Sequence, residues 1–331
     1  MSKNELALRF EQLEKEHSLS GAVLVSQNGE VLFEKAYGFA SRQLNVPNTL
    51  ETKFHIASMT KMFIAMAALI LYEQGRIKLD EKPATYLPEL AVLDKDITLH
   101  HLLSHTAGLQ DIYEVPDLLF EMQKLKHENG DLLSYLAKLP QLFRPGDGWS
   151  YSSTGFILMG YIMEKVTGLP FGELMKRYVL APLSMTNTGL DLPRLINPGR
   201  AYGHAVENGE VVNADNDRLS IFEEAPGELY STVQDLNKWG NALFACPLVS
   251  PQTLQLMFTP HGQGTAWGSF WQYGYGCFLG SGFRMHGGVT QGFRSLIRQY
   301  PAQKVSIIVL LNSDHIEPYT IISAIEPLFI Q

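Results

Sequence analysis

Ser58 and Lys61 stand three residues apart in Ser58-Met-Thr-Lys61, at the start of an apolar stretch that reaches Gln74 and stops at Gly75. Residues i and i+3 share one face of a helix, so the lysine amine can reach the serine hydroxyl. Free backbone N–H groups at a helix start also favour developing negative charge. Apolar neighbours weaken the preference of a lysine for its charged form, which suits it to accept a proton. The pattern predicts a nucleophile and its base; a capping serine followed by a surface lysine is the alternative.

A tyrosine occupies a second place where chemistry is possible. Tyr151 follows the turn at Pro145-Gly146 and precedes a helical segment predicted over 154–167. A turn of this kind can direct a phenol toward a site, and a phenol near cations can share or accept a proton. A structural turn with a packed tyrosine is the alternative.

The third place is His286-Gly-Gly-Val289, just before the last predicted hairpin. Two glycines beside a strand let a substrate backbone approach closely, and an exposed N–H there can donate to an oxyanion. The histidine adds polarity or charge. A turn loosened by glycine is the alternative.

The elements that must position these residues lie at both ends of the chain. An amphipathic helix carries Leu6, Phe10 and Leu13 on one face, and Asn28-Gly29 is typical of a hairpin turn. A second hairpin is predicted at the other end, with strands over 293–300 and 305–311, before a helix through Ile321, Ile322 and Ile325. Strands at both ends predict one antiparallel sheet built from both termini, with the terminal helices on one face.

The middle of the chain is predicted to be mostly helical, and Ser231-Thr-Val-Gln234 has the spacing of a capping box. We therefore expect an α+β fold, with a discontinuous sheet domain over 1–75 and 260–331. A mostly helical inserted domain covers 76–259, and the active site lies in the cleft between the two.

Composition limits the classes of function. The 331 residues are 45% apolar and carry a net charge of -8 without a basic cluster, which argues against nucleic-acid and anionic-membrane partners. Cys246 and Cys277 are expected as buried thiols. The first residues lack a signal-peptide pattern and no long apolar stretch occurs, so we expect a cytoplasmic protein. His100, His101 and His105 lack acidic or cysteine partners at metal spacing, and structural roles are expected for them.

Together, the three motifs in this order resemble the serine β-lactamase and penicillin-binding protein family, most closely its class C β-lactamase, DD-peptidase and esterase group. The resemblance covers most of the chain and extends to Leu102-Leu-Ser-His-Thr-Ala-Gly-Leu109 and Pro182-Leu-Ser-Met185. It implies a β-lactamase/transpeptidase-like fold that needs no metal or cofactor.

The resemblance also implies a role for each matching residue. Ser58 matches the nucleophile, Lys61 the residue that activates it, and Tyr151 the residue that passes protons to the leaving group. The backbone N–H groups of Ser58 and Val289 match the oxyanion hole. The resemblance assigns substrate binding to Ser153, His286, Gly287 and Gly288.

Departures from the family pattern narrow the expected substrate. Ser153 stands where many members have asparagine, and His286-Gly287 replaces Lys-Thr, which removes a permanent charge and a hydroxyl. Glu228 stands where a glycine is frequent, and the sequence offers no reason for it.

We therefore expect a serine hydrolase of small esters or amides, of the carboxylesterase or D-amino-acid peptidase type. The alternatives are a β-lactamase or DD-carboxypeptidase, and a non-catalytic penicillin-binding or scaffold protein. Expected partners are small esters, amides, D-peptides or β-lactams.

Overall fold

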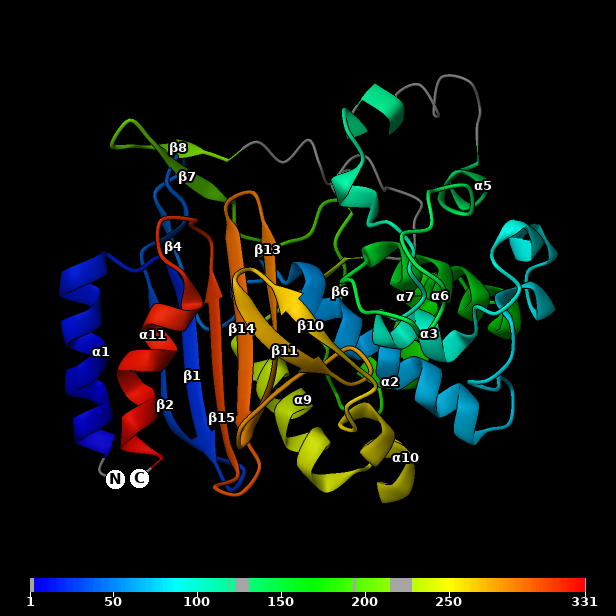
Figure 1. The fold of residues 1–331 in the computed structure, drawn as a ribbon. Helices are drawn as coiled ribbons and strands as arrows, with labels where there is room; N and C mark the ends of the chain where they lie inside the picture. The colour runs from blue at the N-terminus through cyan, green and yellow to red at the C-terminus, as the bar shows by residue number, and fades with distance from the viewer. Residues whose placement is uncertain (1–2, 119, 123–130, 193–194, 215–227, 331) are drawn as a thin grey trace.

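The computed structural model describes residues 3–118, 120–122, 131–192, 195–214 and 228–330. Within them, an eight-stranded antiparallel sheet runs in the order β10-β11-β12-β13-β14-β15-β1-β2. The first strand therefore pairs with the last, as the sequence predicts (Figure 1). The strands of this sheet are β1 (Gly21–Gln27), β2 (Glu30–Tyr37), β10 (Gly262–Ala266), β11 (Ser269–Tyr273), β12 (Phe278–Gly280), β13 (Phe283–Thr290), β14 (Phe293–Tyr300) and β15 (Val305–Leu311).

Turn chemistry accounts for the connection in the first of the two predicted hairpins. Asn28 and Gly29 both take positive φ, at 53° and 85°, as a tight turn between β1 and β2 requires. Strands β14 and β15 have the predicted bounds and flank residues 301–304. Every residue of β15 is buried, so this strand lies at the centre of the core.

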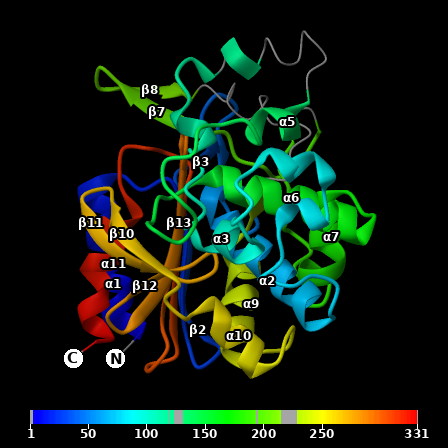
Figure 2. The same ribbon diagram turned by 45° about the vertical axis from the view of Figure 1, so that its right-hand side comes forward.

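Helices cover both faces of the sheet (Figures 1 and 2). Helices α1 (Lys3–His17) and α11 (Pro318–Ile325) lie together on one face, as predicted. On the other face, α9 (Val233–Ala245) packs against β1 and β15. Helix α9 thus joins the sheet although its residues fall in the segment assigned to the helical domain. The domain boundaries remain a prediction.

The helical part positions the candidate residues. Helix α2 (Thr60–Glu73) matches the prediction after a 3₁₀ turn at Ala57–Met59, and α6 (Ser153–Thr167) ends at Gly168 with φ of 71°. The predicted capping box at Ser231 is wrong, because α9 starts one residue later. The hydroxyl of Thr232 caps it by accepting the Asp235 N–H at 3.2 Å.

The remaining elements are short. None of the helices in the described ranges is long and apolar enough to cross a membrane. Their bounds are β3 (Phe39–Ser41), β4 (Val46–Pro47), β5 (Phe54–His55), α3 (Leu99–Ser104), α5 (Leu132–Leu136), α7 (Phe171–Met175), β6 (Gly189–Leu190), β7 (His204–Glu207), β8 (Glu210–Asn213), β9 (Leu229–Ser231) and α10 (Pro251–Met257).

Candidate active site

Ser58 lies in the 3₁₀ turn that joins β5 to α2. The residue before it, Ala57, has φ of 45°, a left-handed conformation that is uncommon for residues other than glycine. Ser58 is half-buried, while Ala57 and Met59 on either side of it are buried. A sharp, packed turn therefore presents the serine side chain at the beginning of the long helix.

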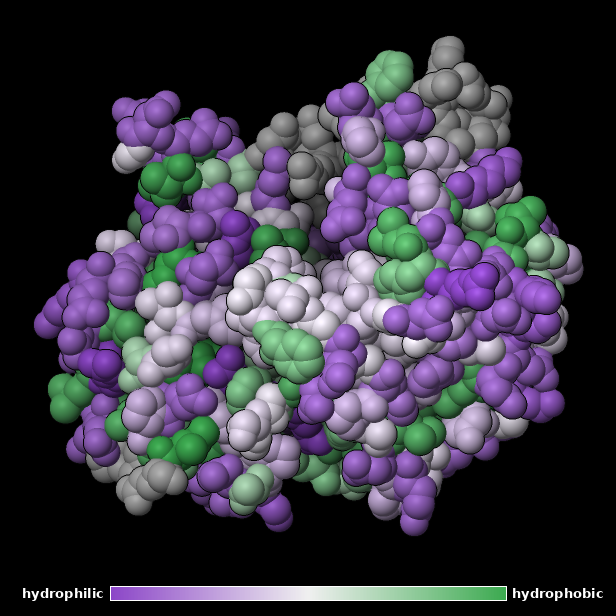
Figure 3. Space-filling view, in the orientation of Figure 1, coloured by the Kyte–Doolittle hydropathy of each residue, from purple (hydrophilic) through white to green (hydrophobic). Residues whose placement is uncertain are grey.

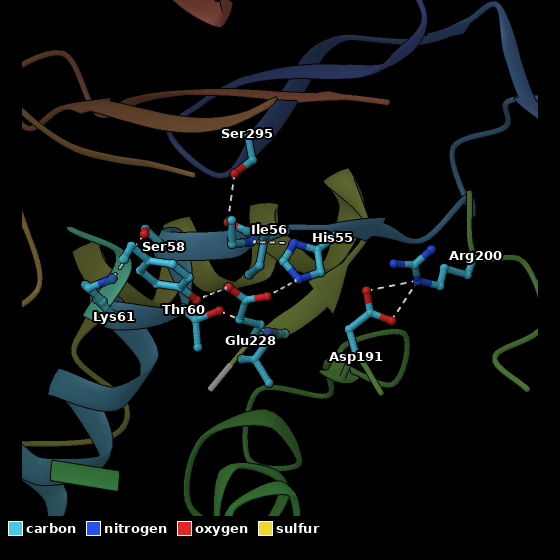
Figure 4. A network of polar contacts seen from close by, with 12 residues as sticks. His55, Ile56, Ser58, Thr60, Lys61, Asp191, Arg200, Glu228 and Ser295 are labelled. Atoms are coloured by element: carbon cyan, nitrogen blue, oxygen red, sulfur yellow. Dashed lines mark hydrogen bonds and ion pairs between the residues drawn. The ribbon is translucent and has the colours of Figure 1, made fainter. Parts of the chain in front are cut away.

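Lys61 lies in the first turn of α2 and is 6% exposed. Its Nζ is 3.0 Å from Ser58 Oγ and 3.2 Å from Ser153 Oγ. The first distance is within the range for direct proton transfer between the two side chains. The helical spacing that the sequence suggested therefore brings Ser58 and Lys61 into contact (Figure 4).

Ser153, for which the sequence predicts a role in substrate binding, lies against Lys61 in the structure. Its side chain is buried, its oxygen accepts a hydrogen bond from Lys61, and its hydroxyl lies 3.4 Å from Asp111 Oδ2. Ser153 is the first residue of α6, and both of its contacts are made within the protein. The chain Lys61–Ser153–Asp111 links the amine to a buried carboxylate. Such a carboxylate stabilises the positive charge that forms when Lys61 takes a proton.

Tyr151 lies beside the same amine. The centroid of its ring is 4.9 Å from Lys61 Nζ. His105 packs against this ring at 4.4 Å, and Phe278 stacks on it at 6.0 Å. Aromatic contacts on several sides thus fix the position of the phenol next to Lys61.

His105 supports the segment that carries Tyr151. Its Nδ1 accepts the backbone N–H of Ser152 at 3.1 Å. Burial and the nearby charge of Lys61 hold the pKa of His105 well below its usual value. The imidazole is therefore neutral. This structural role agrees with the one expected from the sequence.

The other two histidines of that sequence cluster also make contacts within the protein. His100 Nδ1 lies 2.7 Å from the hydroxyl of Tyr275. His101 Nδ1 accepts the backbone N–H of Thr98 at 3.1 Å, as part of the capping box of α3.

His286 differs from the expectation of a polar or charged group open to substrate. It is 1% exposed, and its Nδ1 lies 2.6 Å from the carbonyl oxygen of Gly287. A carbonyl only accepts, so Nδ1 carries the proton and Nε2 can accept the Tyr273 hydroxyl at 3.2 Å. Burial and the charge of Lys61 lower the pKa of His286 to about 3. His286 is therefore a neutral residue of the core, and it brings no charge to a substrate at neutral pH.

Gly288 is required for a contact within the protein. A Cβ at this position lies 2.0 Å from the carbonyl oxygen of Ile56 and 2.6 Å from Ser295 Oγ. Strand β13 thus packs its backbone directly against the turn that carries Ser58. A Cβ added at Gly287 would lie 3.1 Å from the carbonyl oxygen of Ser295, so a side chain is less strictly excluded there than at Gly288. At Gly288, the lack of a side chain therefore lets the turn before Ser58 come close. From the sequence, a substrate was expected to come close at these glycines.

Val289 follows on β13 and is 64% exposed. It pairs with Arg294 in the register of β13 and β14. The strand that carries Val289 contacts the 3₁₀ turn of Ser58. The two predicted oxyanion donors, the N–H groups of Ser58 and Val289, therefore belong to segments in direct contact.

We expect Gly288→Ala to destabilise the protein and to slow any reaction at Ser58. A backbone carbonyl cannot move aside as a flexible side chain can, so overpacking costs at least about 1–3 kcal/mol. Thermal unfolding and the rate of ester hydrolysis measure the two effects. Gly172→Ala is the matched control, because its Cβ meets nothing nearer than 3.6 Å. Equal behaviour of the two variants would contradict the role given to Gly288.

The sequence assigned no role to three polar residues near the turn: Asp111, His55 and Glu228. His55 Nε2 lies 2.7 Å from Glu228 Oε2, and the hydroxyl of Tyr113 donates to Glu228 Oε1 at 3.1 Å. Their spacing along the chain shows no pattern. Among the three, only Glu228 stood out in the sequence, because it occupies a position where the family often has glycine.

Several known proteins are similar to this chain in sequence and in fold. The family model described as Beta-lactamase matches residues 6–324. Penicillin-binding protein PbpX of Bacillus subtilis is 28% identical over 90% of this chain and 72% of its own length. Esterase EstB of Burkholderia gladioli is 35% identical over 54% of this chain and 49% of its own length.

Among solved structures, a penicillin-binding protein from Bacillus halodurans superposes with a TM-score of 0.82 at 26% identity. That match covers 96% of this chain and 99% of the other. The fold expected from the sequence is thereby confirmed. The match of the family model over nearly the whole chain, together with these relatives, shows that the protein belongs to the Beta-lactamase family, whose members are serine hydrolases.

Proposed function

We propose that the protein hydrolyses small, uncharged carboxylic esters through an acyl-enzyme on Ser58. The observation that carries the proposal is the contact of Lys61 Nζ with Ser58 Oγ at 3.0 Å, continued through Ser153 to Asp111. A hydroxyl next to an amine that can take its proton is the arrangement of an activated nucleophile.

The reaction has two halves. Ser58 Oγ attacks the ester carbonyl carbon while its proton passes to Lys61, and the N–H groups of Ser58 and Val289 stabilise the oxyanion. Collapse of this intermediate breaks the bond to the alcohol, which leaves with a proton supplied through Tyr151. Water then attacks the acyl-enzyme, with Tyr151 and Lys61 accepting its proton. The acid is released, and Ser58 regains its hydrogen.

Charge and surface character favour an ester over a substrate that carries a carboxylate. His286, with its pKa of about 3, is neutral at physiological pH and cannot hold a substrate carboxylate by charge. The β10–β11 hairpin offers apolar surface instead. Trp267 and Phe270 on it are 72% and 64% exposed, and the Trp267 ring lies 5.2 Å from that of Tyr151. In Figure 3, the surface over this hairpin is pale to green between more hydrophilic flanks.

A substrate panel tests the proposal. The purified protein is incubated separately with a short p-nitrophenyl ester, a D-Ala-D-Ala peptide, a chromogenic cephalosporin and a fluorescent penicillin. We expect the ester to give the highest kcat/KM. Faster hydrolysis of the peptide would establish the D-amino-acid peptidase type, and faster hydrolysis of the cephalosporin a β-lactamase. Stable labelling by the penicillin, without turnover of any substrate, would overturn the proposal in favour of a binding protein.

A further inference from the structure

The turn before Ser58 contains a backbone conformation that needs support. Ala57 has a φ of 45° and is 3% exposed. Left-handed conformations are unfavourable for alanine because Cβ crowds the following carbonyl. Such a conformation persists only where surrounding contacts hold it in place. Since Ser58 is the next residue, any relaxation of Ala57 moves the nucleophile.

One side chain contacts the backbone of Ala57 from the strand just before the turn. His55 Nδ1 accepts the backbone N–H of Ala57 at 3.1 Å. The accepting nitrogen must carry a lone pair, so the ring proton lies on Nε2 and the imidazole is neutral. His55 Nε2 lies 2.7 Å from Glu228 Oε2. The tautomer that supports Ala57 is therefore the one that donates to Glu228.

Glu228 is itself held in place at its other oxygen. The hydroxyl of Tyr113 donates to Glu228 Oε1 at 3.1 Å. Burial alone raises the pKa of Glu228, but the hydrogen bonds from His55 and Tyr113 and the charge of Lys61 lower it overall. Glu228 is thus an ionised acceptor that fixes the proton of His55 on Nε2 (Figure 4).

Backbone contacts tie the same residues together. Glu228 directly precedes β9, and the first residue of that strand, Leu229, accepts the N–H of Ile56 at 2.9 Å. The N–H of Leu229 donates to Thr60 Oγ1 at 3.0 Å. From the opposite side, Ser295 Oγ donates to the carbonyl oxygen of Ile56 at 2.9 Å. These contacts hold Ile56 just before Ala57 and Thr60 at the start of α2, and His55 holds Ala57 itself.

We propose that His55 and Glu228 are positioning residues that fix the left-handed turn at Ala57 and thereby direct Ser58 toward Lys61. The chain of contacts runs from the Glu228 carboxylate through Nε2–H and Nδ1 of His55 to the Ala57 N–H. Neither residue needs to touch the substrate. The inference rests on the proposed role of Ser58 as a nucleophile, but on no particular substrate.

A fluorophosphonate probe tests this placement, because it reacts with activated serines whatever their natural substrate. Two variants of His55 separate its two contacts. Asparagine can accept the N–H two residues on, as in an Asx turn, but is too short to reach Glu228. Glutamine can reach Glu228 but no longer places its acceptor at the Ala57 N–H.

We expect His55→Gln to slow labelling of Ser58 by up to about 10²-fold, the effect of a small misplacement of a reacting group. His55→Asn should label at nearly the wild-type rate. A second pair extends the test to the carboxylate: Glu228→Gln keeps an oxygen that accepts from His55 Nε2–H, and Glu228→Ala does not. Glu228→Ala should slow labelling, and Glu228→Gln should retain most of it. If His55→Gln does not fold, the labelling rates of Glu228→Ala and Glu228→Gln test the inference by themselves.

Melting temperatures and the KM for a p-nitrophenyl ester are measured for the same variants. A role in positioning predicts that the labelling rate and kcat fall while KM and melting temperature stay close to those of the wild type. Equal labelling rates within both pairs would overturn the inference. So would a loss of rate that only follows the loss of thermal stability. Absence of labelling in the wild type would instead contradict the nucleophile assignment, so the two failures are distinguishable.

Discussion

Ser58→Ala is expected to reduce kcat/KM for a p-nitrophenyl ester by at least about 10³-fold, as loss of a nucleophile does in other serine hydrolases. The variant keeps the left-handed turn and the apolar contacts of α2 but lacks the atom that forms the acyl-enzyme. Mass spectrometry of the intact protein, quenched during turnover, should show an acyl adduct on the wild type and none on the variant. The half-buried position of Ser58 predicts an unchanged melting temperature.

Ser281→Ala provides the matched control. Ser281 is exposed in the turn before β13, at the other end of this strand from Gly288. It should retain wild-type turnover and form the adduct. Ester hydrolysis that survives in Ser58→Ala, or an adduct on another residue, would contradict the assignment of Ser58.

Lys61→Met is expected to slow acylation by about 10²–10⁴-fold, the range for a lost general base. Methionine has a similar length and no proton-accepting group, so the buried site stays filled while Ser58 loses its base. The pre-steady-state burst of p-nitrophenol measures acylation separately from deacylation. A slower burst with little change in substrate affinity is the expected result.

Two further lysine variants make this prediction specific. Lys61→Arg keeps a positive charge but places a group there that does not deprotonate, so it should be slow as well. Lys78→Met removes a surface lysine whose partner is Glu81 and should acylate at the wild-type rate. Fast acylation in Lys61→Arg would mean that Lys61 acts through its charge and not as a base.

The parts of the site predicted from the sequence are those set by local geometry. The contact between Ser58 and Lys61 follows from helical spacing, and the segments of Tyr151 and His286 were found by their motifs. Motifs do not show burial, so the contacts that Ser153 and His286 make within the protein were not predicted. Ser153 supports Lys61 through its own hydroxyl, and His286 lies in the core with a neutral ring.

Much of the fold was predictable for a similar reason. The two-residue turn at Asn28-Gly29, continuous apolar runs and helix-terminating glycines act over a few residues. They place the second hairpin and α2 at nearly their observed bounds, and the first hairpin at its observed turn. The boundary of the helical part was harder to predict. Helix α9 packs against β1 and β15, and its fully buried Trp239 stacks on Phe63 of α2, so the helix is held between the sheet and the helical part. That choice depends on tertiary packing.

The sequence by itself determined the nucleophile candidate, its lysine and the sheet that joins both chain ends, since each follows from short-range periodicity or from motif order. Only the tertiary structure decided what surrounds them. Asp111 reaches Lys61 through Ser153, and Glu228 reaches Ala57 through His55. These links join residues far apart in the chain, and hydrogen bonds of this kind leave no periodic trace in the sequence. They exist because folding removes the polar groups from water and each then needs a partner within the protein.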